Sequence, residues 1–496
     1  MKDPLEKITG LDIYEGSLVP TDTGAYFLGR KGTDKLVGCV GEPCLPNVER
    51  AGELDGTCVC VGACDHANAV ALRERLPWTA PRCLGLATSA GLGDRLGLAT
   101  PGHIRAMRRE GAGLAVVLAQ QSIREMTRTR RTPEQVMDSA TYGVLQEGFT
   151  DGFGSDADHL QRPEDIDATV AAGFTLFTID PGAHVVNEAD EMDAAALSAR
   201  LAELDFETLQ TTAGDMRAAY AGKTFDLAGG GKVEMDELAL LRAGVKYGSA
   251  IAHAVRMHRH LCDAAGGEFE LEVSVDETDS PTTPGEHYFF ASELKRLGVA
   301  WVSMAPRFIG RFEKGVDYIG DLDAFRASFA EHVAVMRTVG PYKMSIHSGS
   351  DKFSIYPIVA ELTGGLVHLK TAGTSYLEAL RAVARIDRRL FEEILTFARE
   401  HYEEDKRTYH VSADLSKVPT VDDLVSDDVD DVELPGILDQ FDTRQALHVT
   451  FGSVLTADGG ERFRKRLYAA LEADEEAHYA ALEAHLGRHV APFARR

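Results

Sequence analysis

The segment ELEVSVDE, at residues 270–277, alternates between apolar and polar side chains as a strand does. Successive side chains of a strand point to opposite faces, so the segment has an apolar face and a polar face. The first face carries Leu271, Val273 and Val275, and the second carries Glu272, Ser274 and Asp276. An ionised carboxylate facing a core costs several kcal/mol unless it is paired. We therefore expect Glu272 to have a cation, a proton or a hydrogen-bond partner.

This strand is one of eight short apolar segments that alternate with helix-length segments. They are CLGLATSAG (83–91), GLAVVLAQQS (113–122), FGSDADHL (153–160), FTLFTID (174–180), FELEVSVDE (269–277), VAWVSMAPR (299–307), YKMSIHSG (342–349) and GLVHLKTAG (365–373). Strands that alternate with helices predict a parallel sheet with right-handed crossovers. Eight such units favour a closed (β/α)8 TIM-like barrel of the α/β class. An open doubly wound sheet is the alternative.

Three further segments are predicted around this barrel, which spans residues 81–380. Residues 1–80 contain short apolar runs broken by Gly and Pro, which indicate a β-rich N-terminal cap. Helical periodicity between the fourth and fifth strands predicts a helical insertion at about 186–266. Residues 381–496 are predicted to form a mainly helical C-terminal extension.

The chain of 496 residues has a formal net charge of −26, from 52 Lys and Arg against 78 Asp and Glu. Such a surface repels nucleic acid and anionic membranes, so neither is an expected partner. The sequence has no apolar run long enough to span a bilayer and no apolar core of a signal peptide near its start. Seven cysteines, an odd number, favour a reducing compartment. We predict a cytoplasmic protein, and homo-oligomerisation stays open.

Four of the cysteines, Cys44, Cys58, Cys60 and Cys64, are close in the sequence. The segment GTCVCVGAC, at residues 56–64, alternates as a strand would and places Cys58 and Cys60 on one face. The paired C-x2-C spacing typical of zinc sites is absent. Small buried side chains are therefore the favoured interpretation of this cluster.

Polar and ionisable side chains recur where the predicted strands end, which is where TIM barrels carry their active sites. They include Gln121, Asp158, His159, Asp276, Glu277, Arg307, His347, Ser348 and Lys370. Imidazole and carboxylate ligands from different strand ends suit a divalent metal cation such as Zn, Mn, Fe, Co or Ni. His159 and His347 are the first candidate ligands, and His368 is the third. For each histidine taken singly, a core or rim position is the alternative.

Six segments match a known family: GLGDRLGLATPGH (91–103), DADHLQ (156–161), ELEVSVDET (270–278), EHYFFASELKRLG (286–298), YKMSIHSGSDKFSIYP (342–357) and HLKTAGTSYLEALR (368–381). Together they resemble the tagaturonate/fructuronate epimerase family of bacterial hexuronate catabolism. The most specific part is IHSGSDKFSIYP followed by HLKTAGTSY. The resemblance spans nearly the whole chain.

The resemblance implies a metal-dependent isomerase that interconverts D-tagaturonate and D-fructuronate, two keto-uronates that differ at one hydroxyl-bearing carbon. It also implies that Asp158 and Glu272 are the acid/base pair and that His159 and His347 are metal ligands. The third ligand is left open, with His368 placed ahead of Glu277 and Asp276.

The inverted carbon of such a substrate is β to the ketone, so its C–H is not acidified by that carbonyl. Retro-aldol cleavage, rotation of the aldehyde fragment and re-addition avoid the difficulty, with a metal stabilising the enediolate. Transient oxidation by a nicotinamide is the other route, but no G-x-G-x-x-G fingerprint follows the first strand. The candidates for holding the substrate carboxylate are Arg95, Arg307, Lys352 and Lys370.

Two other functions stay open at this point. A metal-dependent aldolase or sugar isomerase could use the same barrel and the same metal. A non-enzymatic sugar-acid-binding protein is the second alternative, although carboxylates on the inner face of the barrel favour an enzyme.

Overall fold

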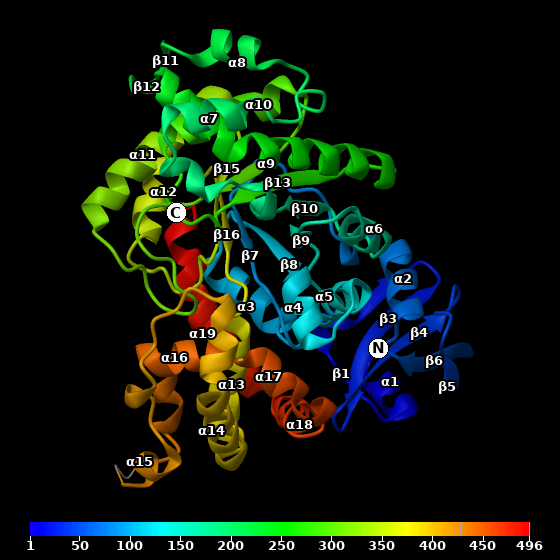
Figure 1. Cartoon of the computed structure of the whole chain (residues 1–496). Helices are drawn as coiled ribbons and strands as arrows, with labels where there is room; N and C mark the ends of the chain where they lie inside the picture. Colours follow the sequence, from blue (N-terminus) through cyan, green and yellow to red (C-terminus); the bar gives the residue numbers. More distant parts are fainter. Residues whose placement is uncertain (427–428, 496) are drawn as a thin grey trace.

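The computed structural model describes residues 1–426 and 429–495, and its centre is a closed barrel of eight parallel strands (Figure 1). The strands follow one another around the ring in chain order. They are β7 (Ser89–Gly91), β8 (Ala115–Ser122), β9 (Gly154–Leu160), β10 (Leu176–Ile179), β13 (Glu270–Val275), β14 (Ser303–Pro306), β15 (Lys343–Ile346) and β16 (Val367–Lys370). Because β16 pairs with β7, the ring closes. This confirms the predicted barrel and rules out the open sheet.

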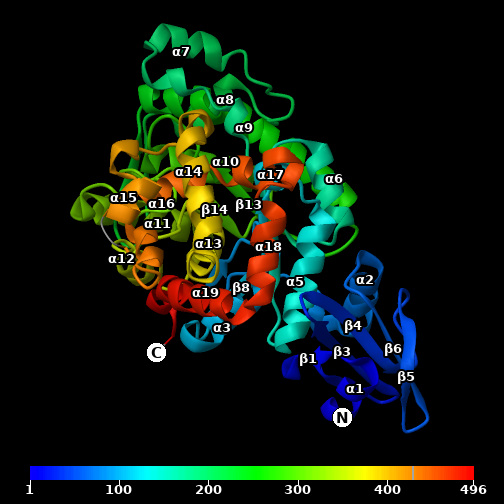
Figure 2. The same ribbon diagram turned by 90° about the horizontal axis from the view of Figure 1, so that it is seen from below.

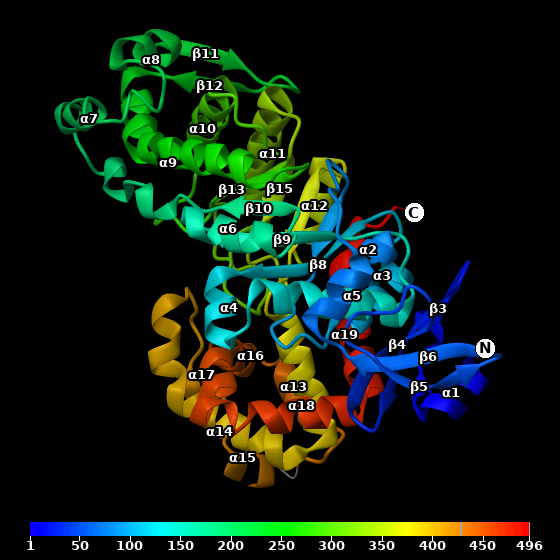
Figure 3. The ribbon, with the colours of Figure 1, turned by 90° about the vertical axis from the view of Figure 1, so that its right-hand side faces the viewer.

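Helices pack around the outside of the barrel (Figure 3). They are α3 (Thr100–Glu110), α4 (Ile123–Thr129), α5 (Pro133–Glu147), α6 (Pro163–Ala171), α9 (Glu237–Ala264), α10 (Pro284–Arg296), α11 (Leu322–Val339) and α12 (Tyr356–Thr363). Local sequence sets where several of them start. In α10, Thr283 and Glu286 form a reciprocal capping box and Pro284 occupies the first turn. The capping box satisfies backbone N–H groups that the helix itself leaves unpaired.

Strand β13 has the two faces that its alternation predicts. Leu271, Val273 and Val275 belong to the main hydrophobic cluster, which also contains residues of the surrounding helices. Glu272 is fully buried, and its Oε1 lies 2.8 Å from Nζ of Lys370 on β16. The expected cationic partner of Glu272 is therefore present inside the barrel.

An antiparallel sheet precedes the barrel in the chain and lies beside it (Figure 2). Its strands are β1 (Asp12–Ile13), β2 (Val19–Thr21), β3 (Gly24–Lys31), β4 (Asp34–Gly41), β5 (Glu49–Leu54) and β6 (Thr57–Ala63), with the helices α1 (Lys2–Thr9) and α2 (His66–Arg75). Helix α2 packs on α5 of the barrel. Lys35 of β4 also pairs with Glu475, at 2.6 Å.

Between β10 and α9 the chain forms an insertion with two helices, α7 (Ala194–Leu201) and α8 (Ala213–Tyr220). It also contains a hairpin of β11 (Lys223–Asp226) and β12 (Lys232–Met235). The segment GGGK at 229–232 forms the end of the turn that closes this hairpin and the first residue of β12. None of the helices in the described part of the chain is long and apolar enough to cross a bilayer.

Helices that follow the barrel cover the carboxyl ends of its strands (Figure 2). They are α13 (Thr374–Ile386), α14 (Arg388–Asp405), α15 (Val421–Ser426), α16 (Phe441–Val449), α17 (Phe451–Thr456), α18 (Arg464–Ala473) and α19 (Glu475–Val490). Helices α13 to α18 share a hydrophobic cluster of their own. Leu482, Leu486 and Val490 of α19 instead belong to the barrel cluster. Helix α17 packs on α4, which directly follows β8.

A buried polar network attaches these helices to the loop after β15. The carboxylate of Asp351 in this loop lies 3.1 Å from Arg444 of α16 and 2.6 Å from His485 of α19. The backbone N–H of Asp351 donates to Nε2 of His489, at 2.8 Å. Arg444 also pairs with Glu378 of α13, at 3.3 Å. The C-terminal helices therefore hold the loop that begins at the end of β15.

Replacing Arg444 with Met should lower the free energy of unfolding by about 3–5 kcal/mol, because it leaves buried carboxylates without their cation. Although burial opposes ionisation, Arg444 and His485 hold the pKa of Asp351 well below its usual range. The loss should therefore be complete at neutral pH and shrink below about pH 4, where the unfolded carboxyl is protonated. Urea denaturation at several pH values measures it.

Arg326→Met is the matched control, because it breaks the solvent-exposed pair of Arg326 with Glu361. Exposed pairs add little to stability, so this variant should unfold like the wild type. Equal unfolding of Arg444→Met and Arg326→Met would contradict the role given to the buried network.

Candidate active site

Asp158 and His159, at the end of β9, reach the mouth of the barrel together. The pairing register between β9 and β10 shifts between Phe177 and Ile179. Such a shift marks a β-bulge, which lets consecutive residues depart from strict alternation. His159 also has a left-handed backbone, with φ of 54°. The bulge therefore brings a carboxylate and an imidazole from one strand to one site.

His347, directly after β15, completes this group. Asp158, His159 and His347 each offer one ligand atom, and these atoms lie within 4.8 Å of one another. Nδ1 of His159 is buried and has no hydrogen-bond partner among the described residues. One carboxylate oxygen and two imidazole nitrogens are donors that suit Zn, Mn, Fe, Co or Ni. These three residues therefore fit a divalent metal ion.

Two carboxylates flank His347. Its Nε2 lies 2.6 Å from Oε1 of Glu272, and its Nδ1 lies 3.2 Å from Oδ1 of Asp276. Although burial opposes the charged ring, Asp276 and Glu272 raise the pKa of His347 to about 10. Carboxylates in such positions orient an imidazole that binds a metal, and the metal replaces a proton of the ring.

The ammonium group of Lys370, inside the barrel, is surrounded by three carboxylates. Nζ lies 2.9 Å from Asp156, 2.6 Å from Asp158 and 2.8 Å from Glu272. Burial opposes this positive charge, yet the carboxylates hold the pKa of Lys370 well above its usual value. Burial also raises the pKa of Asp156 to about 6, although Lys370 opposes the shift. The candidate site therefore lies beside a buried layer of side chains in which the ammonium group of Lys370 is paired with three carboxylates.

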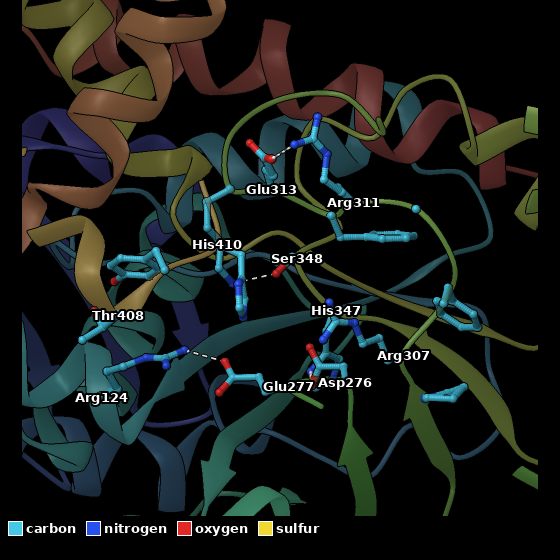
Figure 4. Close-up of a pocket in the computed structure, with 16 residues that line it drawn as sticks. Arg124, Asp276, Glu277, Arg307, Arg311, Glu313, His347, Ser348, Thr408 and His410 are labelled. Carbon is cyan, nitrogen blue, oxygen red and sulfur yellow. Dashed lines mark hydrogen bonds and ion pairs between the residues drawn. The ribbon is translucent and has the colours of Figure 1, made fainter. Parts of the chain in front are cut away.

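A cavity of about 280 Å³ lies between these strand ends and the chain that follows α14. Asp276, Glu277 and His347 lie side by side on it, with Arg124 and Arg307 on opposite sides of them (Figure 4). Its charged and imidazole lining residues are Arg124, Asp276, Glu277, Arg307, Arg311, Glu313, Lys314, His347 and His410. The cavity has four Lys and Arg side chains against three carboxylates, whereas the whole chain has a net charge of −26. The cavity therefore attracts an anion more strongly than the rest of the surface does.

Arg307 differs from the other arginines of the pocket because its guanidinium has no ion-pair partner in the described part of the chain. Arg124 pairs with Glu277 at 2.9 Å, and Arg311 pairs with Glu313 at 3.3 Å. Arg307 forms no ion pair within the described ranges, 1–426 and 429–495. Its planar group is free to accept a carboxylate in bidentate fashion.

Sequence reasoning missed Arg124, Lys314 and His410. Arg124 comes two residues after β8 ends, so a wider search past the strand ends would have included it. Lys314 lies in the loop after β14, and its Nζ donates to Oγ of Ser348 at 2.7 Å. Burial, followed by the neighbouring Arg124, lowers the pKa of Lys314. His410 follows α14, and no signal in the sequence indicates that this segment packs over the barrel.

Three predicted carboxylate binders have other partners in the structure. The guanidinium of Arg95 pairs with Glu125 at 2.7 Å and lies 3.7 Å from the ring centre of Phe451. Nζ of Lys352 donates to the carbonyl oxygens of Glu313, Val316 and Ser350. Lys370 is neutralised by the three barrel carboxylates. Arg95 and Lys352 brace the loops around the site, because their donors are already in use.

Gln121 and Ser348 have different surroundings in the structure. Gln121 is buried in β8, and both polar atoms of its amide lack hydrogen-bond partners among the described residues. Buried amides are normally satisfied, so Gln121 has capacity for a ligand hydroxyl or a water. Ser348 lines the pocket and has a left-handed backbone, with φ of 48°, which turns the chain just after His347.

His368 lies apart from the three-residue group. It is fully buried in β16, and Oγ of Ser89 lies 2.9 Å from its Nδ1. Burial lowers the pKa of His368 to about 3, so its ring stays neutral. The structure thus brings Asp158, rather than His368, together with the two predicted histidine ligands.

A second set of potential ligands, Asp351, His485 and His489, is also buried and close together. Nδ1 of His489 donates to the carbonyl oxygen of His485, at 3.0 Å. Nε2 of His489 accepts a backbone N–H, so its lone pair is in use. This set does not fit a metal ion.

A family model described as UxaE, tagaturonate epimerase, matches residues 14–493. The tagaturonate/fructuronate epimerase of Thermotoga maritima is 42% identical over 483 residues, which cover 97% of this chain and 96% of that protein. The chain belongs to the tagaturonate epimerase family. This confirms the resemblance found in the sequence, and the chain is an enzyme, an isomerase of the epimerase type.

Solved structures of the family have the same fold. The fructuronate-tagaturonate epimerase UxaE from Cohnella laeviribosi, in a complex with one glycerol, superposes with a TM-score of 0.90 at 37% identity. That match covers 99% of this chain and 98% of the other. A structure of the same enzyme with two glycerols gives a TM-score of 0.90 at 36% identity and covers 100% of both chains.

Proposed function

We propose that this chain interconverts D-tagaturonate and D-fructuronate by retro-aldol cleavage and re-addition, with a divalent metal ion held by Asp158, His159 and His347. The observation that carries the proposal is the proximity of these three donors at the strand ends, under a cavity rich in cations. Family membership supports the reaction. The three donor side chains support the binding of a metal ion. They differ from the ligands predicted from the sequence in one residue, because Asp158 takes the place of His368.

The substrate carboxylate is assigned to Arg307. Of the four predicted candidates, Arg307 is the one that lines the cavity, and its guanidinium is unpaired among the described residues. A buried guanidinium–carboxylate contact also fixes the orientation of the substrate, because both groups are planar forks. Lys314 faces the same cavity and supplies positive charge to oxygen atoms that become negative during cleavage.

In the proposed reaction, a carboxylate takes the proton of the hydroxyl at the carbon to be inverted. The adjacent carbon–carbon bond breaks, its electrons pass to the ketone fragment as an enediolate, and an aldehyde forms. The aldehyde turns its other face, the bond re-forms, and the proton returns to the new hydroxyl. A divalent metal bound to the three ligands would act as a Lewis acid on the substrate oxygens.

Asp276 and Glu277 are better placed than Glu272 for these proton transfers. Both line the cavity, whereas Glu272 is fully buried and pairs with Lys370 and His347. We therefore give Glu272 a positioning role, because it orients the imidazole of His347. Asp158 is assigned to the metal rather than to proton transfer.

The same barrel and metal would also serve an aldolase or a sugar isomerase, which would release or rearrange the fragments. A binding protein would need the cavity but not the metal. Analysis of products from each of the two keto-uronates separates these alternatives from an epimerase.

Replacing His347 with Ala should remove bound metal and activity together, because one of three ligands is lost. Elemental analysis of the purified variant measures the metal. His410→Ala is the matched control, because His410 lines the same cavity outside the ligand group and should retain the metal. Loss of metal from His368→Gln, with metal retained in Asp158→Asn, would reinstate His368 as the third ligand.

Arg307→Leu should raise KM for both keto-uronates by about 10–100-fold, because a hydrogen bond to a charged group is worth about 1.5–3 kcal/mol. The turnover number should change less, since the contact is made equally in the ground state and the transition state. Arg311→Leu serves as the control, because Arg311 pairs with Glu313. An unchanged KM in Arg307→Leu would rule out this carboxylate contact.

Epimerisation in heavy water tests whether the C–H bond of the inverted carbon breaks during the reaction. The retro-aldol route retains the original hydrogen on the inverted carbon, so that position should carry no deuterium in the product. NMR or mass spectrometry of the isolated product measures it. Deuterium at that carbon would show proton exchange there and eliminate the retro-aldol route.

A further inference from the structure

The cysteine cluster of the N-terminal sheet forms a row of sulfur atoms on one sheet face. Cys39 on β4 and Cys60 on β6 are direct partners in the antiparallel register, so their side chains lie on the same face. Cys39 is joined to Cys44 by a disulfide, with Cα atoms 5.9 Å apart. Sγ of Cys58 lies 3.5 Å from Sγ of Cys60. The row therefore runs from Cys44 through Cys39 and Cys60 to Cys58.

Packing places the two ends of this row in different environments. Cys39 is fully buried in the cluster that the sheet shares with α2, and Cys44 and Cys60 pack at its edge. Cys58 is exposed to solvent. The opposite face of β6 presents Val59 and Val61 to a separate apolar cluster. The sulfur atoms thus connect the interior of the sheet with the solvent along a single face.

The surroundings of Cys60, on β6, differ from those of Cys64, the cysteine that directly follows this strand. Burial and the neighbouring Cys58 raise the pKa of the Cys60 thiol, although Arg50 of β5, its register partner, opposes this shift. Burial raises the pKa of Cys64 to about 12, so it is a thiol at neutral pH and a poor nucleophile. Cys60 is the better placed attacking group, because it is the direct register partner of Cys39, whereas Cys64 lies beyond the end of β6.

We propose that Cys58, Cys60, Cys39 and Cys44 form a thiol–disulfide exchange site, in which the exposed Cys58–Cys60 pair and the Cys39–Cys44 disulfide exchange two electrons. The ligand class is a soluble thiol–disulfide couple that reacts at Cys58. The site lies in the N-terminal sheet, outside the barrel that carries the catalytic group.

The exchange balances without an external oxidant. The Cys60 thiolate attacks Sγ of Cys39, the Cys39–Cys60 bond forms, and Cys44 leaves as a thiolate that takes up a proton. The Cys58 thiolate then attacks Sγ of Cys60, the Cys58–Cys60 bond forms, and Cys39 leaves as a thiolate. One disulfide is present before and after, and the mixed Cys39–Cys60 disulfide is the intermediate.

Tryptic cleavage makes the intermediate directly visible. Cleavage after Lys35, Arg50 and Arg73 puts Cys39 and Cys44 in peptide 36–50 and puts Cys58, Cys60 and Cys64 in peptide 51–73. The mixed disulfide alone cross-links the two peptides through Cys39 and Cys60. The full-length protein is incubated with a graded ratio of reduced to oxidised dithiothreitol, acid-quenched, alkylated with iodoacetamide and digested.

Mass spectrometry should detect both internal disulfides and the Cys39–Cys60 cross-link in the wild type. The cross-link should increase several-fold in Cys58→Ser, because the second step is blocked. It should dominate in the double variant Cys44→Ser/Cys58→Ser, because both thiols that resolve the mixed disulfide are absent. Cys262→Ser is the control, since Cys262 lies exposed on α9, and it should match the wild type. Circular dichroism checks that each variant is folded.

One result would overturn the proposal. In that result, Cys58 and Cys60 are alkylated as free thiols at every ratio, and no cross-link forms in folded Cys58→Ser or in the folded double variant Cys44→Ser/Cys58→Ser. The Cys39–Cys44 disulfide would then be purely structural, or would not form in solution.

Discussion

The ammonium group of Lys370 is the interaction on which the catalytic end of the barrel depends. It lies between Asp156, Asp158 and Glu272, which come from two different strands, and all of these side chains are buried. Three carboxylates without a cation would not stay ionised in this interior, because the cost of desolvation is several kcal/mol for each. Lys370 keeps them charged, and the strands that carry them therefore meet in one arrangement.

Lys370 and its three carboxylates in turn orient the group formed by Asp158, His159 and His347. Glu272 contacts both Lys370 and His347, so the ring of His347 is held by a carboxylate whose own position is set by the barrel. Asp158 belongs to both layers, because it contacts Lys370 and lies in the group with His159 and His347. Such supporting contacts decide whether a metal or substrate meets its ligands in a productive geometry.

The C-terminal helices complete the site from outside the barrel. Through Arg444 and His485 they hold Asp351 and thus the loop that begins at His347. The segment after α14 also brings His410 to the cavity. An active site at the strand ends of a TIM barrel is usually enclosed by loops. In this chain, a helical extension encloses it, and most of the extension has a hydrophobic core of its own.

The sequence by itself determined the barrel, its eight strands and the inward carboxylate of β13. These features follow from local periodicity, because alternation and strand length are properties of neighbouring residues. It also indicated that catalytic or metal-binding residues lie at the ends of β9 and β15. A specific set of motifs pointed to the tagaturonate/fructuronate epimerase family. His159 and His347 were predicted as a pair, and the structure brings them together.

Only the tertiary structure decided which groups share the site. A strict two-residue period would separate Asp158 from His159, and the register shift beside β9 cancels that separation. The partners of Lys352, Arg95 and Lys370 depend on contacts between distant segments, so a list of cations at strand ends cannot say which of them is free. Arg307 has no ion-pair partner among the residues that the structure describes, and His410 reaches the cavity, because of how separate elements pack. Periodicity describes neighbours along the chain, whereas a site is made of neighbours in space.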